Sequence, residues 1–277
     1  MELTHALVLG IVEGLTEFVP VSSTGHLILA GSWLGLGQSA EQKQAIDAFD
    51  IVIQAGAWLA CCWYYAPLLL ERVRDLSSDD PVRNQRGRRL AVGLGVAFVP
   101  VMVVGLLLRK QIKALLFGVT PVAVALAVGG VLMIAADLWF AKRPQQGESK
   151  DLGHLDLRTA AIVGGFQCFS LLPGTSRSMS TMIGGLFAGL DRRAAADFSF
   201  LLAIPVLGAA TAYETMKEWR ILLDQIGVEA ITIGLLASFL VGWAAIAGFL
   251  RILGKVGLLP FGVYRLVLAL VVWKTLT

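Results

Sequence analysis

The chain has 277 residues, of which 56% are hydrophobic and 16% are charged, and its mean hydropathy is +0.73. Charged residues make up about a quarter of an ordinary soluble domain. Together with apolar runs that approach about 20 residues, this composition excludes a soluble helical domain and predicts an all-α polytopic membrane protein. The three cysteines have neither zinc-site nor disulfide spacing.

The chain begins with an apolar region, residues 3–36, that is interrupted by glycine, proline, serine and charged side chains. The first five residues lack the basic segment of a secretory signal, so no cleaved signal peptide is expected. Neither half of the region is long enough to cross a bilayer alone. It therefore predicts a re-entrant helix-loop-helix hairpin, in which irregular backbone and polar groups are tolerated only because protein covers them or they line a wet cavity.

The arrangement of a hairpin followed by three apolar spans occurs twice. Repeat one covers residues 1–141, a cytoplasmic loop is predicted at 142–158, and repeat two covers residues 159–277 with its hairpin at 159–190. The six predicted transmembrane helices are residues 49–66, 90–108, 119–141, 197–216, 228–250 and 259–276.

An odd number of spans in each repeat gives the second repeat the opposite orientation, which predicts an inverted repeat in one integral membrane domain. Residue matches 153 positions apart give weak support. These matches are Pro20 with Pro173, Ser23 with Ser176, and Gly31 with Gly184.

Basic residues divide unequally between the two sets of loops, fourteen against six, and the richer set is predicted to be cytoplasmic. The first hairpin then opens from outside and the second from the cytoplasm. The loop arginines are interpreted as topological signals and lipid contacts, so no nucleic-acid partner is expected. The richer set is Arg72, Arg74, Arg83, Arg86, Arg88, Arg89, Lys142, Arg143, Lys150, Arg158, Arg192, Arg193, Arg251 and Lys255, and the poorer set is Lys43, Arg109, Lys110, Lys113, Lys217 and Arg220.

Two carboxylates in the first hairpin, Glu13 and Glu17, are four residues apart and would share one helix face at about 5–6 Å. Carboxylates this close resist double ionisation, so either they share a proton or a cation lies between them. Hard oxygen ligands favour Mg²⁺ or Ca²⁺. The alternative is that both side chains face an aqueous vestibule and contribute only solubility.

Hydroxyl groups and a histidine follow, at Ser22, Ser23, Thr24 and His26. One interpretation is that a hydroxyl caps the second half-helix. The other is that one serine is a nucleophile, with His26 or Glu17 as its base. A lone histidine in an apolar stretch is usually packed and hydrogen-bonded, but these neighbours favour a functional role for His26.

Arg177 is the informative residue of the second hairpin, because a guanidinium at membrane depth needs an anionic partner. Its planar fork suits phosphate oxygens. The alternative is an ion pair with Glu13 or Glu17 that holds the hairpins together, which does not exclude phosphate binding.

The turn before Arg177 contains Gly174, Thr175 and Ser176. Backbone N–H groups at the start of the next half-helix would form a cradle for an anion. Carboxylates, a cation, a nucleophile and a guanidinium within a membrane together suit attack on a phosphate whose other end is lipid.

Three segments carry a family resemblance. Residues 13–26 (EGLTEFVPVSSTGH), 173–178 (PGTSRS) and 198–205 (FSFLLAIP) resemble the signatures of the bacterial undecaprenyl-diphosphate phosphatases, the bacitracin-resistance family. The resemblance extends over essentially the whole chain, and the charged positions show no departure from it.

The resemblance implies removal of the terminal phosphate of undecaprenyl diphosphate, which recycles the lipid carrier for cell-wall synthesis. It implies a divalent cation, a location in the bacterial inner membrane, and an active site on the periplasmic or outer side. Glu13 and Glu17 would be the acidic pair, Ser23 the nucleophile, His26 a base or rival nucleophile, and Arg177 the diphosphate ligand. The polyprenyl tail would lie between apolar helices among the membrane lipids, and the oligomeric state stays open, a homodimer included.

Two other functions remain open on the sequence alone. A transporter or flippase of a lipid phosphate would use the same anion site, since inverted repeats with broken helices are a transporter architecture. An intramembrane protease using Ser23 and His26 would leave the acidic pair and Arg177 without a role. Arg265 in the last span is interpreted as structural, pairing with a carbonyl or extending toward the interface.

Overall fold

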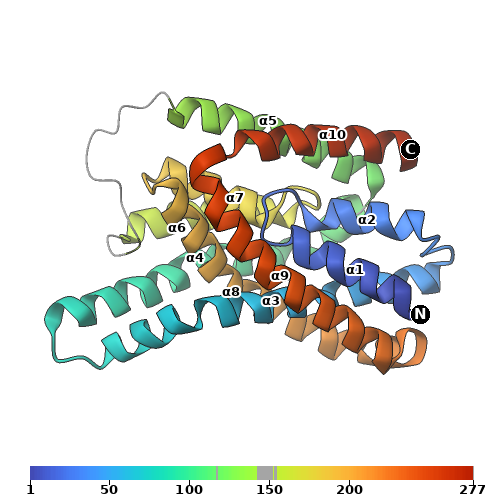
Figure 1. The fold of residues 1–277 in the computed structure, drawn as a ribbon, viewed down its shortest axis with the longest axis horizontal. Coiled ribbons are helices and arrows are strands. Elements are labelled where there is room, and N and C mark those ends of the chain that lie inside the picture. The colour runs from blue at the N-terminus through green and yellow to red at the C-terminus, as the bar shows by residue number, and fades with distance from the viewer. Residues whose placement is uncertain (117, 142–151, 153–154, 277) are drawn as a thin grey trace.

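The computed structural model describes residues 1–116, 118–141, 152 and 155–276. The predicted loop at 142–158, with Lys142, Arg143 and Lys150, therefore lies largely outside the described residues, as do the side chains of Arg109, Lys110 and Lys113. The elements in chain order are α1 (Leu3–Thr16), α2 (Ser23–Trp33), α3 (Ala40–Leu76), α4 (Pro81–Leu116), α5 (Val119–Ala141), α6 (Leu157–Gln167), the 3₁₀ turn η2 (Cys168–Leu171), α7 (Arg177–Phe187), α8 (Arg192–Ile221), the π-helical turn η3 (Leu222–Ile226), α9 (Val228–Val256) and α10 (Leu259–Leu276) (Figure 1).

Six helices in the described part of the chain are long and apolar enough to cross a membrane: α3, α4, α5, α8 with η3, α9 and α10. All six predicted spans are thereby confirmed, and the protein is a multi-pass integral membrane protein. Helix α3 extends well beyond the predicted span at both ends. The reason is that polar residues of good helix propensity continue the backbone past the apolar stretch on which the prediction depends.

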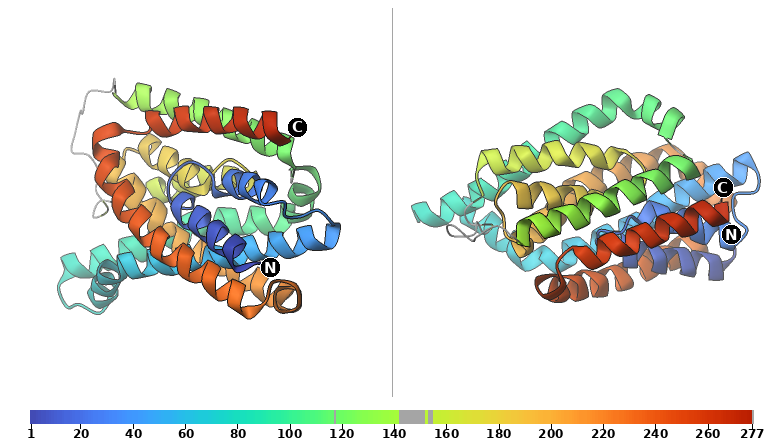
Figure 2. Two further views of the ribbon diagram at one scale, coloured as in Figure 1. Left: turned by 45° about the vertical axis from the view of Figure 1, so that its right-hand side comes forward. Right: turned by 90° about the horizontal axis from the view of Figure 1, so that it is seen from above.

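Four helices are too short to cross. Helices α1, α2, α6 and α7 have 14, 11, 11 and 11 residues, which corresponds to about 16–21 Å at 1.5 Å per residue, against about 30 Å of hydrocarbon core. Helices α1 and α2 form the first helix pair, and α6, η2 and α7 form the second helix pair. In each, the two helices lie side by side and the turn between them lies inside the molecule (Figures 1 and 2).

The two helix pairs have the same backbone landmarks, 154 positions apart. Helices α1 and α6 begin at Leu3 and Leu157, and α2 and α7 end at Trp33 and Phe187. The same three backbone hydrogen bonds close both pairs: Leu34 to Ala30, Gly35 to Ser32 and Leu36 to Gly31 in the first; Ala188 to Gly184, Gly189 to Leu186 and Leu190 to Gly185 in the second.

The landmarks correct the residue matching made from the sequence. Ser22 and Ser176 occupy equivalent positions, with φ angles of 74° and 75°. The first residues of α2 and α7 are then Ser23 and Arg177. The sequence comparison was one residue out of register because the proline of the second turn comes one position earlier relative to the helix that follows.

Helices from residues 1–141 pack against helices from residues 157–276. Helix α1 packs along α9, α6 packs along α4, and α3 packs against α8 and α5 against α10. The α1–α9 contact is close enough to require glycine at position 14, since a Cβ atom there would lie 2.6 Å from the carbonyl oxygen of Ser238. The partner exchange buries the turns of both helix pairs at the centre of the molecule.

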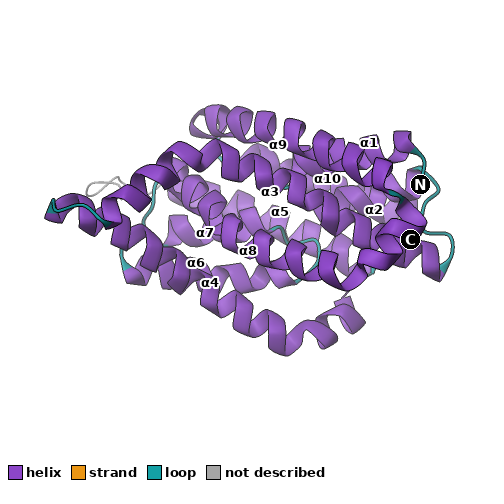
Figure 3. Cartoon of the chain, turned by 90° about the horizontal axis from the view of Figure 1, so that it is seen from below, coloured by secondary structure: helices purple, strands orange, loops and turns teal. Residues whose placement is uncertain are grey.

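The ends of the helices gather at two opposite ends of the molecule. The N- and C-termini lie at one end, and the α3–α4 turn lies at the other (Figures 1 and 3). The N-terminal amine also donates to the carbonyl oxygen of Ile226 at 3.2 Å, which joins the chain start to the α8–α9 junction. The long helices therefore run roughly along one common direction, and the turns of both helix pairs lie between the two ends.

Candidate functional site

A small polar cavity of about 220 Å³ lies where the turns of the two helix pairs meet. Seven of the residues predicted for the site line it: Glu17, Ser22, Ser23, Thr24, Gly174, Ser176 and Arg177. These residues lie on two segments about 150 positions apart in the sequence, and the fold brings them to one cavity, which we call the polar cavity.

Glu17 is the centre of the hydrogen bonding in the polar cavity. It is 7% exposed. Its Oε2 atom accepts hydrogen bonds from Ser23 Oγ at 2.8 Å and from Gln54 Nε2 at 3.3 Å. Its Oε1 atom accepts from Arg177 Nη2 at 3.1 Å. One carboxylate therefore joins the first residue of α2 to the first residue of α7.

Arg177 forms the ion pair with Glu17 that was the alternative prediction, and its guanidinium still has N–H groups left to donate. Its Nη1 atom donates to the carbonyl oxygen of Ser199 at 3.1 Å, and the guanidinium lies 5.3 Å from the ring centroid of Phe18. Its Nε atom has no hydrogen-bond partner among the described residues. Nε itself is buried, but Nη1 and Nη2 each make one hydrogen bond and each carry a second N–H group, so Arg177, which lines the polar cavity, keeps donors for an anion bound there.

Further hydrogen bonds hold the two turns together. Ser178 Oγ donates to the carbonyl oxygen of Phe18 at 2.9 Å, and Thr181 Oγ1 and Ser199 Oγ lie 2.6 Å apart. Fully buried Arg265 donates from Nη2 to the carbonyl oxygen of Gly174 at 2.9 Å, which confirms its structural interpretation. These contacts fix the turns before any ligand binds.

Ser22 and Ser176 are the two described non-glycine residues with a left-handed backbone. Such conformations cost of order 1–3 kcal/mol and are concentrated at functional sites. Ser176 caps α7 by accepting from the backbone N–H of Met179 at 3.3 Å, whereas Ser22 makes no side-chain cap. The hydroxyl of Ser22 is thus not committed to the start of α2.

His26 does not bond to the predicted nucleophile. Its Nδ1 atom lies 2.7 Å from the carbonyl oxygen of Ser22, and its Nε2 atom lies 2.8 Å from the hydroxyl of Tyr264, on which the imidazole stacks. Because a carbonyl oxygen only accepts, Nδ1 carries a proton and neutral His26 accepts at Nε2. Of the two candidate bases, Glu17 is the one that contacts Ser23.

Glu13 is completely buried, and neither carboxylate oxygen has a hydrogen-bond partner in the part of the chain that the structure describes. It lies one helical turn before Glu17, as predicted. No group of three or more His, Cys, Asp or Glu residues within the described ranges is arranged to hold a metal. A pair of carboxylates with one unpartnered member still fits Mg²⁺, which proteins hold with one or two carboxylates plus substrate phosphates.

Thr175 was predicted to belong to the site, but it does not line the polar cavity. It lines a neighbouring apolar cavity rather than the polar cavity, although Gly174 and Ser176 on either side of it line the latter. The sequence analysis also gave no role to Tyr264. Gln54 was detectable as a lone amide within an apolar run, but nothing in the sequence linked Tyr264 to His26, 238 positions away.

Comparisons with known proteins place the whole chain in one family. The model of the family described as bacitracin resistance protein BacA matches residues 6–271. An undecaprenyl-diphosphatase of Sorangium cellulosum (strain So ce56) is 51% identical over 97% of this chain and 85% of its own length. Undecaprenyl-diphosphatase 1 of Chromobacterium violaceum is 44% identical over 99% of this chain and 96% of its own length, and the undecaprenyl-diphosphatase of Nitrosomonas europaea is 43% identical over 99% and 94%.

Proposed function

The chain belongs to the bacitracin resistance protein BacA family, and from this membership we infer that it is an undecaprenyl-diphosphate phosphatase. It hydrolyses the terminal phosphate of undecaprenyl diphosphate to give undecaprenyl phosphate and inorganic phosphate. The product is the lipid carrier for cell-wall synthesis. The names of its relatives support this activity over 97–99% of the chain.

The observation that carries the mechanism is the Glu17 carboxylate, which contacts Ser23 and Arg177 in one cavity. Ser23 Oγ attacks the terminal phosphorus, and its proton passes to Glu17 Oε2. The bond from that phosphorus to the bridging oxygen breaks, undecaprenyl phosphate leaves, and water then releases phosphate from the serine. A positioned general base typically contributes 10²–10⁴-fold to such a step.

In this mechanism Arg177 pairs first with Glu17 and then with the diphosphate of the substrate. Without substrate, its guanidinium and the Glu17 carboxylate neutralise each other in a buried environment, where either charge alone would be costly. The diphosphate competes for the guanidinium, so its binding frees Oε1 of Glu17, while Oε2 stays in contact with Ser23. The hydroxyls of Ser22, Thr24 and Ser176 are further donors to the phosphate oxygens.

A divalent cation, Mg²⁺ or Ca²⁺, would be held by Glu13 and Glu17 together with diphosphate oxygens. The unpartnered oxygens of Glu13 support this assignment, because a buried carboxylate without a donor or a cation is costly. When bound, the cation would neutralise charge on the diphosphate.

For the architecture, we propose that both helix pairs are re-entrant hairpins and that the chain is an inverted repeat of residues 1–141 and 159–277. The common landmarks and the exchanged helix partners support this. The excess of basic loops makes the α3–α4 turn cytoplasmic, so the first hairpin opens from outside and the active site is reached from the periplasmic or outer side.

Phosphate release by the purified protein in detergent tests this function. Undecaprenyl diphosphate should yield inorganic phosphate, and Glu17→Ala and Arg177→Ala should each slow the release by about 10³-fold. Tight binding of the substrate without phosphate release would contradict the enzyme and support a transporter or flippase, which would use the same anion site.

A further inference from the structure

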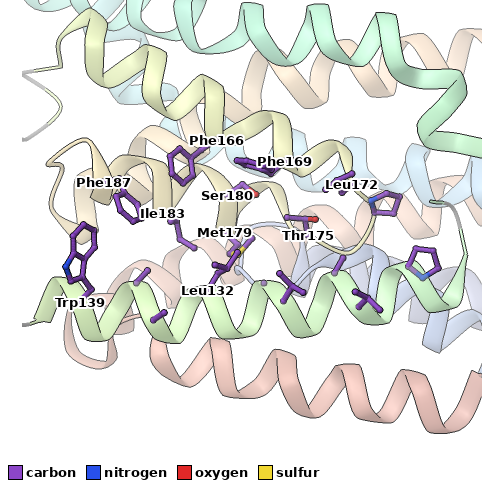
Figure 4. A pocket seen from close by; sticks show the side chains of 18 of the residues that line it. Leu132, Trp139, Phe166, Phe169, Leu172, Thr175, Met179, Ser180, Ile183 and Phe187 are labelled. Atoms are coloured by element: carbon purple, nitrogen blue, oxygen red, sulfur yellow. The ribbon is translucent and has the colours of Figure 1, made fainter. Parts of the chain in front are cut away.

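An apolar groove of about 1070 Å³ runs between α5 and the second helix pair (Figure 4). One wall is α5, which lines the groove from Thr120 to Trp139. The other wall comes from α6, η2 and α7, and includes Phe166, Phe169 and Phe187. The close-up shows these side chains directed into the space between the helices. None of the mechanism above uses this apolar groove.

The apolar groove and the polar cavity share a wall. Leu172 and Pro173 line both. Alternate residues of the following turn then face different spaces: Thr175 lines the apolar groove, whereas Gly174 and Ser176 line the polar cavity. A molecule with its phosphates in the polar cavity would therefore reach the apolar groove by passing Leu172 and Pro173.

The first helix pair meets α5 through α2. Helix α2 packs on both α5 and α10, and buried side chains such as Leu29, Leu126 and Leu268 fill the contact. Helix α7 also contacts α5, but the apolar groove remains beside that contact. The packing thus leaves a deep space on the side of α5 that adjoins the phosphate site.

The dimensions of the apolar groove suit a long unbranched path. From Pro121 to Trp139 it follows α5 for about 27 Å at 1.5 Å per residue, close to the roughly 30 Å of a hydrocarbon core. An aromatic cluster lies at the end away from Leu172, with ring centroids 4.9 Å apart for Trp139 and Phe187 and 5.5 Å apart for Phe166 and Phe187.

We propose that the apolar groove binds the isoprenoid chain of the substrate, from Leu172 and Pro173 along α5 toward the aromatic cluster, and thereby selects long-chain prenyl diphosphates. The proposal rests on the proposed function, since it takes the phosphates to lie in the polar cavity. Apolar burial along the whole groove strengthens binding of a long chain, whereas a short chain fills only the part near Leu172.

A matched pair of leucines on α5 provides the test. Leu132 lines the apolar groove, whereas Leu138 lies outside its lining, and the two are similarly exposed at 52% and 49%. Leu132→Trp should block the far part of the apolar groove, and Leu138→Trp should add a tryptophan facing lipid. KM and kcat are measured in detergent with undecaprenyl diphosphate and with farnesyl diphosphate.

We expect Leu132→Trp to raise KM for undecaprenyl diphosphate about tenfold or more and KM for farnesyl diphosphate less than about twofold, a change in selectivity of about fivefold or more, which corresponds to roughly 1 kcal/mol. Leu138→Trp should change neither value more than twofold. Val128→Phe is a smaller change on the same wall and should give the same separation between substrates if Leu132→Trp fails to fold.

Two results would overturn the proposal. If Leu132→Trp and Leu138→Trp act alike on the long substrate, the apolar groove holds ordinary lipid chains. If Leu132→Trp affects both substrates equally, the change acts on the phosphate site and not on chain recognition. Absence of phosphate release by the wild-type protein from either substrate would instead contradict the proposed function, and the groove assignment with it.

Discussion

The first helix pair presents a hydroxyl, Ser23, at the position where the second presents a guanidinium, Arg177, although the two pairs share backbone landmarks 154 residues apart. Both side chains contact Glu17, which belongs to the first pair alone. In the proposed mechanism, the first turn supplies the nucleophile and the base, and the second turn supplies the anion ligand. Equivalent backbone positions therefore place the two side chains, whereas the residue at each position determines its chemistry.

The surroundings of the two pairs differ as well. Helix α2 is covered by α5 and α10, and His26 is held there by Tyr264. Helix α7 instead borders the apolar groove. Only the second pair therefore lines the apolar groove, although its helix α7 is more deeply buried than α2.

Ser23→Ala should have the largest effect and tests the chemical side of the comparison. Loss of a nucleophile should lower kcat by about 10⁴-fold or more, while binding of undecaprenyl diphosphate changes less than a few-fold. Phosphate release and equilibrium binding measure the two parts. Thr24→Ala, which removes a neighbouring hydroxyl of the polar cavity, should cost about tenfold or less. A near-normal rate for Ser23→Ala would shift the nucleophile to His26 or water.

Arg177→Ala tests the equivalent position in the second pair. Loss of the guanidinium should lower kcat/KM by about 10³-fold and, unlike Ser23→Ala, should weaken binding. Arg177→Lys should recover only part of the loss, because an ammonium does not reproduce the planar fork. If both Ser23→Ala and Arg177→Ala altered kcat alone, the assignment of anion binding to the second helix pair would be contradicted.

Removal of divalent cations tests the role of Glu13. A chelator should abolish phosphate release, and Mg²⁺ or Ca²⁺ should restore it. Glu13→Gln keeps the shape of the buried side chain but removes a charged ligand, so the cation concentration for half-maximal activity should rise about tenfold or more. Full activity in chelator would contradict the cation assignment, and an unchanged cation requirement in Glu13→Gln would remove this residue from it.

Ser178→Ala should have the smallest effect, because it removes one contact between the pairs and no reacting group. The carbonyl oxygen of Phe18 loses its donor, so the free energy of unfolding should fall by about 1–2 kcal/mol. Ser180→Ala is the matched control, since its hydroxyl bonds only within the second pair, to the carbonyl oxygen of Ser176. Thermal unfolding in detergent compares them. Equal stability losses would mean that the Ser178 contact does not join the pairs.

Much of the fold was predictable from the sequence, because bilayer thickness and the apolar pattern together limit what each segment can do. The six spans and the two interrupted regions followed from length and hydropathy alone. The register between the pairs did not, since Pro20 and Pro173 match at 153 positions while the backbone repeats at 154. Proline and serine identity is visible in sequence, but the φ angles that define equivalence are not.

The convergence of Glu17 and Arg177 was predictable because each charge at membrane depth needs a partner. The partner of Ser23 was left open between His26 and Glu17, since sequence spacing does not give the direction of a side chain around a turn. The apolar groove was also beyond sequence reasoning, because it depends on how α5 packs against helices of the other half.

The central claim is that the two helix pairs meet at one diphosphate, and a structure with an undecaprenyl methylene-diphosphonate tests it most directly. The methylene bridge prevents hydrolysis and keeps the phosphonate charges. We predict the terminal phosphonate within hydrogen-bond distance of both Ser23 Oγ and Arg177, in the cavity beside Glu17. A bound diphosphonate that contacts only one helix pair, or that lies outside this cavity, would contradict the claim.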